Sequence, residues 1–237
     1  MKHRAVSNDD ARVGDSESAA TEAEQVRMEV AEPVADVAAM FGERVDLARR
    51  YHRWLGDVAT VRGLIGPREV PRLWSRHILN SAVVGEAIPE RSTVADIGSG
   101  AGLPGIPLAI ARPDVSVTLI EPLLRRTTFL EEVVADLGLG NVTVVRGRAE
   151  EKAVKKAVGT FDIVTSRAVA PLGRLAGWSL PLVKPGGLMV ALKGASAPEE
   201  IARDAKEIRK AKGVDPESVE IGIEAGYPTH VVRIRRA

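Results

Sequence analysis

The stretch that most constrains the fold is the glycine-rich sequence DIGSGAGLPG, which follows the short apolar run TVADI. Gly98, Gly100 and Gly102 stand at alternate positions, so the backbone there carries few side chains. A glycine turn between a strand and a helix exposes unpaired N–H groups at the positive end of the helix dipole and lets a ligand lie against the backbone. The sequence predicts a ligand site at the carboxyl end of the first strand of an open α/β sheet.

The spacing of these glycines excludes two common nucleotide motifs. The dinucleotide fingerprint G-x-G-x-x-G needs a third glycine at the position where this chain has Leu103. A P-loop is excluded because no Gly-Lys-Ser/Thr sequence follows. Glu121 ends the next apolar run, VSVTLIE, where a carboxylate can accept hydrogen bonds from both ribose hydroxyls of an adenosine group. A solvated carboxylate at a strand end is the alternative interpretation.

The pattern after residue 93 indicates the fold class. Short β-branched runs alternate with helical stretches, which is typical of βαβ units around a parallel sheet. The terminal VEIGIEAGYPTHVVRIRRA contains two strand-like runs with a turn and no helix between them, so the chain should end in an antiparallel pair. We predict an α/β, Rossmann-like fold with a seven-stranded, mostly parallel sheet whose last strand is antiparallel.

The remaining sequence divides the chain into three parts. Residues 1–33 form an acidic, serine- and alanine-rich tail with no aromatic residue, a composition typical of disorder. Residues 34–92 should form a helical cap, with one helix over 33–59 and another over 68–88 that tolerates Pro71 only in its first turn. Residues 93–237 should form the ligand-binding domain. The whole chain carries a net charge of +1, and without the acidic tail the folded part is moderately basic, which is compatible with a polyanionic partner.

Composition excludes several kinds of site. The chain has no cysteine and only four scattered histidines, so we expect no disulfide, no cysteine nucleophile and no metal. No apolar run is long enough to span a membrane, and the N-terminus lacks the apolar core of a signal peptide. We expect a monomer in the cytoplasm.

Several motifs together resemble a known enzyme class. D-x-G-x-G-x-G, an acid ending the second strand, FDIVTSRA at the fourth strand and LVKPGGLMVALKG at the fifth are similar to class I S-adenosylmethionine-dependent methyltransferases. Within that class, DIGSGAGLPGIPLAI, WSRHILNS, TSRAVAPL and LKG resemble the RsmG (GidB) family, bacterial enzymes that methylate N7 of a guanine in 16S ribosomal RNA. The resemblance implies S-adenosyl-L-methionine as cofactor and 16S ribosomal RNA or the small ribosomal subunit as partner.

The resemblance also implies site residues. The cofactor would contact the positions Gly98, Gly100, Leu103, Glu121, Ala149, Glu150 and Arg167. Ala149 and Glu150 could equally form the acidic first turn of a helix. Asn80 departs from the family, which usually has Asp there, so any role of a charge at that position is in doubt.

Three residues are candidates for substrate contact, namely Arg76, His77 and Lys193. A surface lysine is an alternative for Lys193, and a packed structural histidine is an alternative for His77. At the end of the fourth strand, the Arg167 fork could reach the methionine carboxylate, guanine O6 or a phosphate, or could pair with a nearby acid.

The acceptor is constrained by what the sequence lacks. Exocyclic amine methylation commonly uses an Asn/Asp-Pro-Pro-aromatic motif after the fourth strand, and ring-carbon methylation commonly uses a cysteine, but this chain has neither. Guanine N7 carries a lone pair and no proton, so its methylation needs no general base. We therefore expect no catalytic residue beyond positioning by Arg167. A small-molecule methyltransferase and a non-catalytic RNA-binding module remain alternatives.

Overall fold

A computed structural model describes residues 31–237, so most of the predicted tail, residues 1–33, lies outside the described residues. The described chain contains one seven-stranded sheet in the order β3-β2-β1-β4-β5-β7-β6. Its strands are β1 (Thr93–Ile97), β2 (Ser116–Glu121), β3 (Val142–Arg146), β4 (Phe161–Arg167), β5 (Val183–Leu192), β6 (Gly213–Ile221) and β7 (Thr229–Arg236). All neighbours from β3 to β5 pair in parallel, whereas β7 pairs antiparallel with both β5 and β6. The predicted sheet, including its antiparallel last strand, is confirmed.

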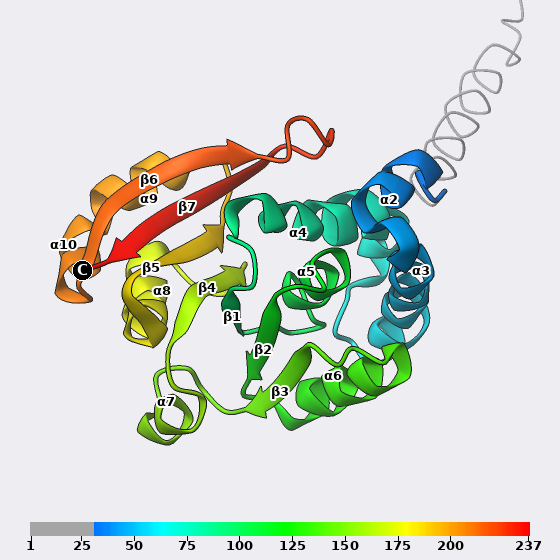
Figure 1. Cartoon of the computed structure of the whole chain (residues 1–237), viewed down its shortest axis with the longest axis horizontal. Helices are drawn as coiled ribbons and strands as arrows, with labels where there is room; N and C mark the ends of the chain where they lie inside the picture. Colours follow the sequence, from blue (N-terminus) through cyan, green and yellow to red (C-terminus); the bar gives the residue numbers. More distant parts are fainter. Residues whose placement is uncertain (1–30) are drawn as a thin grey trace, which may run out of the picture.

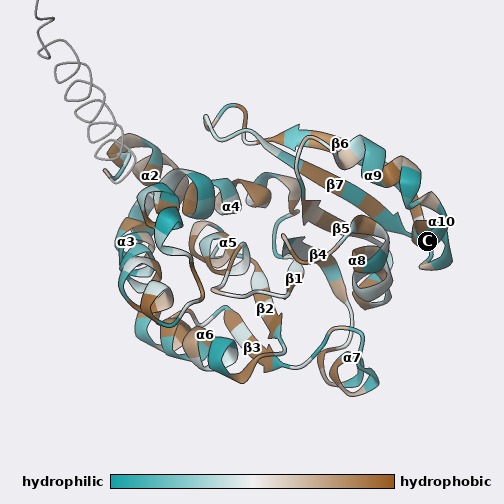
Figure 2. Ribbon diagram, turned by 180° about the vertical axis from the view of Figure 1, so that it is seen from behind, coloured by the Kyte–Doolittle hydropathy of each residue, from teal (hydrophilic) through white to brown (hydrophobic). Residues whose placement is uncertain are grey.

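Helices cover both faces of this sheet (Figure 1). One apolar core joins the cap to α5 and α6, and a second core joins the other face to α7, α8 and the helices that precede β6. These helices are α5 (Gly105–Ala111), α6 (Leu124–Leu137), α7 (Lys152–Val158), α8 (Leu172–Ser179), α9 (Ala197–Arg203) and α10 (Ala205–Lys210), with a short turn η6 (Leu180–Leu182) after α8. In Figure 2 the helices of both layers alternate between hydrophilic and hydrophobic segments, as expected of helices with one buried face.

The cap is helical, but it is more interrupted than its sequence suggested. Its elements are α2 (Val34–Phe41), η1 (Gly42–Arg44), α3 (Val45–Arg53), η2 (Trp54–Ala59), η3 (Pro67–Arg72), η4 (Leu73–Leu79), α4 (Asn80–Ala82) and η5 (Val83–Ala87). The single helix expected over 68–88 is wrong in detail, because Pro71 lies inside the tight turn η3 and the longer helical run begins only at Leu73. A proline has no N–H to donate and its ring disfavours continuation of a helix through it.

The C-terminal hairpin closes onto the cap. Between β6 and β7, the Tyr227 hydroxyl donates to Asp36 of α2 at 2.5 Å, and the Gly222 N–H donates to Glu86 of η5 at 2.9 Å. The loop between β6 and β7 therefore contacts the cap at both α2 and η5. In the described part of the chain, no helix is long and apolar enough to cross a membrane.

Candidate functional site

The glycine turn lies between β1 and α5, as predicted. Gly98, Gly100 and Gly102 all have positive φ angles, of 70°, 59° and 100°. A Cβ at Gly98 would lie 2.9 Å from a methyl of Val169, so this glycine is required by close packing as well as by its backbone. A Cβ at Gly100 would meet only the Gly98 carbonyl oxygen, at 3.8 Å, so the space beside Gly100 is open.

Glu121 joins the end of β2 to this turn. One carboxylate oxygen accepts the Gly100 N–H at 3.0 Å, and the other accepts the Leu123 N–H at 3.1 Å. The side chain is only 1% exposed, and Arg126 of α6 lies 3.7 Å away. The solvated alternative for Glu121 is therefore wrong, and the carboxylate keeps further lone pairs for a ligand.

Asp96 is a buried carboxylate to which the sequence analysis gave no role. Its Oδ2 accepts the Gly105 N–H at 3.1 Å, whereas its Oδ1 is buried and has no hydrogen-bond partner among residues 31–237. Burial raises the pKa of Asp96 to about 7. An orphaned buried oxygen directly behind the glycine turn is the kind of group that a ligand donor satisfies.

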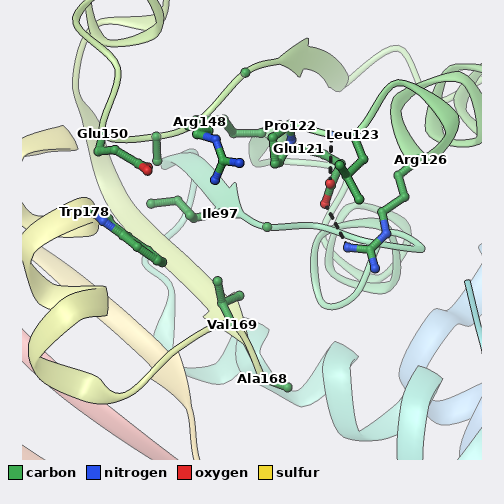
Figure 3. A pocket seen from close by; sticks show the side chains of 14 residues that line it. Ile97, Glu121, Pro122, Leu123, Arg126, Arg148, Glu150, Ala168, Val169 and Trp178 are labelled. Carbon is green, nitrogen blue, oxygen red and sulfur yellow. Dashed lines mark hydrogen bonds and ion pairs between the residues drawn. The ribbon is translucent and has the colours of Figure 1, made fainter.

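A cavity of about 380 Å³ opens beside the turn. We call it the first cavity. Figure 3 shows Glu121 and Arg126 at one end of this cavity and Glu150 and Trp178 at the other. Of the seven positions expected to contact the cofactor, four line it, namely Gly98, Glu121, Ala149 and Glu150. Arg126 and Trp178 line it as well, and the sequence analysis missed both because nothing in their local pattern marks them.

The other three expected cofactor positions do not line the first cavity. Gly100 is tied to the cavity through Glu121, and Leu103 packs against the core beneath the cap. Arg167 instead lines a second cavity of about 380 Å³. Ala168, at a φ of 53°, lines both cavities and so stands between them.

The second cavity is rich in basic side chains. The cap, the ends of β4 and β5, and the start of β7 form its walls, with polar lining residues Arg76, Asn80, Arg167, Lys193, Thr229 and His230. The Asn80 amide contacts the Thr229 hydroxyl, which joins the cap to β7. The predicted substrate residues Arg76 and Lys193 therefore come together here with Arg167.

The surroundings of these basic residues differ. Lys193 is largely buried and donates to the Ala170 carbonyl at 2.9 Å and to Glu200 at 2.8 Å, so it fixes the loop after β4. Arg76 is more than half exposed, at 58%, and its Nε lies 3.8 Å from Glu69. Arg167 donates to His77 Nδ1 at 2.9 Å and to the Ser81 hydroxyl at 3.0 Å. His77 is buried behind Arg167 and does not line the second cavity.

No metal centre is formed in the part of the chain that the structure describes. Among residues 31–237, no three His, Asp or Glu side chains are grouped so that they could hold a metal ion. The functional surface is thus built from backbone amides, two buried carboxylates and several arginines. Such a surface can orient a nucleoside-containing ligand in the first cavity and an anionic or polar partner in the second.

Comparison with known proteins points to one family. The family model described as rRNA small subunit methyltransferase G matches residues 44–226. A protein of Corynebacterium glutamicum named ribosomal RNA small subunit methyltransferase G is 65% identical over 84% of this chain and 90% of its own length. A protein of the same name from Mycobacterium marinum is 52% identical over 86% of this chain and 90% of its own length.

Solved structures share the fold at low sequence identity. The mitomycin 7-O-methyltransferase MmcR matches with a TM-score of 0.54 and 18% identity, over 72% of this chain and 57% of that one. TYW2 of M. jannaschii, solved in complex with AdoMet, matches with a TM-score of 0.51 and 21% identity, over 70% of this chain and 78% of that one. These neighbours are class I methyltransferases, so the fold class predicted from the sequence is confirmed.

Proposed function

The chain belongs to the rRNA small subunit methyltransferase G family, and on that premise we propose that it methylates N7 of a guanine in 16S ribosomal RNA. It is an S-adenosylmethionine-dependent methyltransferase that acts on small-subunit ribosomal RNA. The observation that carries the finer proposal is the pair of cavities that meet at Ala168, one beside the glycine turn and one lined by basic side chains.

We assign the first cavity to the cofactor. Its residues fit such a group, because Glu121 has free lone pairs for hydroxyls, the space beside Gly100 is open, and Asp96 Oδ1 lacks a partner among the described residues. We propose that Gly98, Gly100, Leu103, Glu121, Ala149, Glu150 and Arg167 hold it. When bound, S-adenosylmethionine supplies a methyl group already activated on a sulfonium, so the chain's task is to orient the two reactants.

We assign the second cavity to the acceptor nucleotide. We propose that Arg76, Lys193 and Arg167 contact this nucleotide, and the forked donors of Arg167 can bind a purine oxygen or a phosphate. We propose that His77 supports this site from behind, through its contact with Arg167.

The arrangement also favours an acceptor that needs no deprotonation. Both ring nitrogens of His77 are engaged, one with Glu69 at 2.7 Å and one with Arg167 at 2.9 Å, so this histidine is not free to take a proton from a substrate. Guanine N7 meets that condition because its lone pair lies in the ring plane and carries no proton. Geometry and entropy, rather than acid-base chemistry, then supply the rate enhancement.

We further propose the division of labour along the chain and the setting in which it works. Residues 34–92 act as a helical cap over the acceptor side, and residues 93–237 act as the methyltransferase domain. The protein acts as a monomer on 16S ribosomal RNA or the assembled small subunit, and it works in the cytoplasm, where that substrate is found.

One comparison tests the proposal. Ribosomal RNA nucleosides from cells with and without the gene are compared by mass spectrometry, and the purified protein is given S-adenosylmethionine with small subunits or deproteinised 16S RNA. We expect one N7-methylguanosine to disappear with the gene and to be restored in vitro. A different methylated nucleoside would overturn the N7 assignment. Cofactor binding without turnover on RNA would favour a binding module or a small-molecule enzyme.

A further inference from the structure

Three side chains link the cap to the end of β4. Glu69 lies on η3, His77 on η4 and Arg167 at the last position of β4. The Glu69 carboxylate is 2.7 Å from His77 Nε2, and His77 Nδ1 is 2.9 Å from an Arg167 nitrogen. The His77 side chain is only 10% exposed, so these contacts are made largely out of water.

The two partners dictate the protonation of the ring between them. An arginine can only donate, so His77 Nδ1 must carry a lone pair. A carboxylate accepts, so His77 Nε2 carries the hydrogen. His77 is therefore held as one neutral tautomer with one ring orientation. Burial, together with the charge of Arg167, lowers the pKa of His77, in agreement with that state.

The contacts leave part of the Arg167 fork available. Its Nη1 donates to the His77 carbonyl at 3.3 Å and to the Ser81 hydroxyl at 3.0 Å, and its Nη2 donates to the His77 ring. Within residues 31–237, the Arg167 Nε–H makes no hydrogen bond, and one Nη2 hydrogen is likewise left over. Arg167 lines the second cavity, and the next residue, Ala168, lines both cavities.

We infer that Glu69 and His77 are positioning residues, which hold the Arg167 guanidinium so that its remaining donors bind an oxygen of a reactant. The inference rests on the proposed function. The oxygen belongs either to the carboxylate of the cofactor's methionine end or to O6 of the acceptor guanine. In either case, N7 of the guanine has to stay free of the arginine, because its lone pair forms the new bond.

The test replaces one nitrogen of the ring at a time. In His77→Asn, the side-chain amide places an oxygen near the Nδ1 position and can still accept from Arg167. In His77→Gln, the amide reaches the Nε2 position and Glu69, but the acceptor for Arg167 is lost. Each variant is titrated with S-adenosylhomocysteine by calorimetry and assayed for the KM and kcat of small-subunit methylation. His52→Gln is the control, because His52 stacks on Trp74 at 4.7 Å in the same cap and does not contact Arg167.

We expect His77→Gln either to bind S-adenosylhomocysteine about tenfold more weakly or to raise the KM for small subunits about tenfold. We expect both quantities in His77→Asn to stay within about threefold of the wild type. A loss in the calorimetric titration assigns the oxygen to the cofactor, and a raised KM for small subunits assigns it to the guanine. If the two variants behave alike, or if His52→Gln loses as much as His77→Gln, His77 is a packing residue and the inference is overturned.

A second pair covers the case in which the His77 variants do not fold. The Glu69 side chain is 32% exposed, so its replacement leaves no buried cavity. Glu69→Gln keeps an acceptor for His77 Nε2–H, whereas Glu69→Ala removes it. We therefore expect Glu69→Ala to impair the same binding step more than Glu69→Gln does. Equal effects of these two variants also overturn the inference. A wild-type protein that binds S-adenosylhomocysteine but methylates no guanine in small subunits refutes the proposed function instead and leaves the calorimetric comparison intact.

Discussion

At the scale of single residues, the site depends on two buried carboxylates with different partners. Glu121 accepts two backbone N–H groups, whereas Asp96 accepts one and keeps an unpaired oxygen among the described residues. The sequence predicted Glu121 from its position at a strand end. It did not predict the state of Asp96, because the burial and the missing partner depend on how α5 packs back onto β1.

Glu121→Ala should weaken the binding of S-adenosylhomocysteine by about 1 to 3 kcal/mol, since hydroxyl donors of the ligand and the Gly100 N–H both lose an acceptor. Calorimetric titration measures the change. Glu131→Ala, an exposed acid on α6, serves as the control and should bind like the wild type. Unchanged affinity in Glu121→Ala would remove this residue from the cofactor site.

Asp96→Asn should stabilise the ligand-free protein at pH 8. Burial raises the pKa of Asp96 from 3.8 to about 7, so the folded state binds the proton more tightly than the unfolded state does. The free energy of unfolding therefore falls as the pH rises from about 4 to 7, and the full cost, up to about 4 kcal/mol, is present above that range. The asparagine carries no charge and can still accept the Gly105 N–H.

Urea unfolding of the wild type and of Asp96→Asn at pH 5 and pH 8 measures the change in the free energy of unfolding. The stability gained by Asp96→Asn should be clearly larger at pH 8. Asp162→Asn is a control of opposite sign. Lys184 and Thr93 lower the pKa of Asp162 to about 2, so the stability it contributes is present above pH 3.8 and is lost as the pH falls toward 2. Asp162→Asn should therefore destabilise the protein at pH 8. An equal gain from Asp96→Asn at both pH values would contradict the argument.

At the scale of elements, the sequence predicted regular structure well and irregular structure poorly. The strands were predictable because buried parallel strands are short, β-branched and separated by helices, as TVADI and FDIVTSRA show. The cap was less predictable, because Pro71 and the wide helical turns of η2 and η4 interrupt its helices. Arg167 lies 90 residues after His77 in the sequence, so no local pattern could reveal their contact.

Gly100→Val should abolish cofactor binding and leave the fold intact. The valine side chain would project into the open space beside the turn, and the positive φ of 59° adds strain of about 1 to 2 kcal/mol. Gly63→Val separates these two effects, because Gly63 has a similar φ of 66° and open surroundings but lies in the cap. We expect similar melting temperatures for the two variants and loss of S-adenosylhomocysteine binding only in Gly100→Val. Binding retained in Gly100→Val would contradict the assignment of the glycine turn to the cofactor site.

At the scale of the whole molecule, the described fold brings the C-terminal hairpin against the cap, beside the carboxyl ends of β4 and β5. The cap supplies Arg76 and Asn80, the parallel half of the sheet supplies Arg167, and the C-terminal hairpin supplies His230 and its neighbours. The sequence predicted the fold class, and four of the seven cofactor positions it suggested line the first cavity. The second cavity was only partly predictable, since it exists only after the hairpin contacts the cap.

Methyl transfer measured in a single turnover, with saturating cofactor and small subunits, should be nearly independent of pH from about 6 to 9. The acceptor carries no proton to remove, and Arg167, which can only donate, faces His77 Nδ1 and so favours the neutral ring. Rapid-quench measurements across the range test this. A rate that rises tenfold per pH unit between 6 and 7, and that His77→Ala abolishes, would reveal a general base and contradict the N7 assignment.

Ala168 lines both cavities, and this has a consequence for inhibitor design. A single molecule that joins an adenosine-like group to a purine through a short linker could occupy both cavities. Such a compound incurs the entropic cost of association once instead of twice, and each half raises the effective concentration of the other. The linker has to pass Ala168, whose backbone is in the left-handed region. Selectivity would come from this contact, because it lies outside any pocket that methyltransferases share.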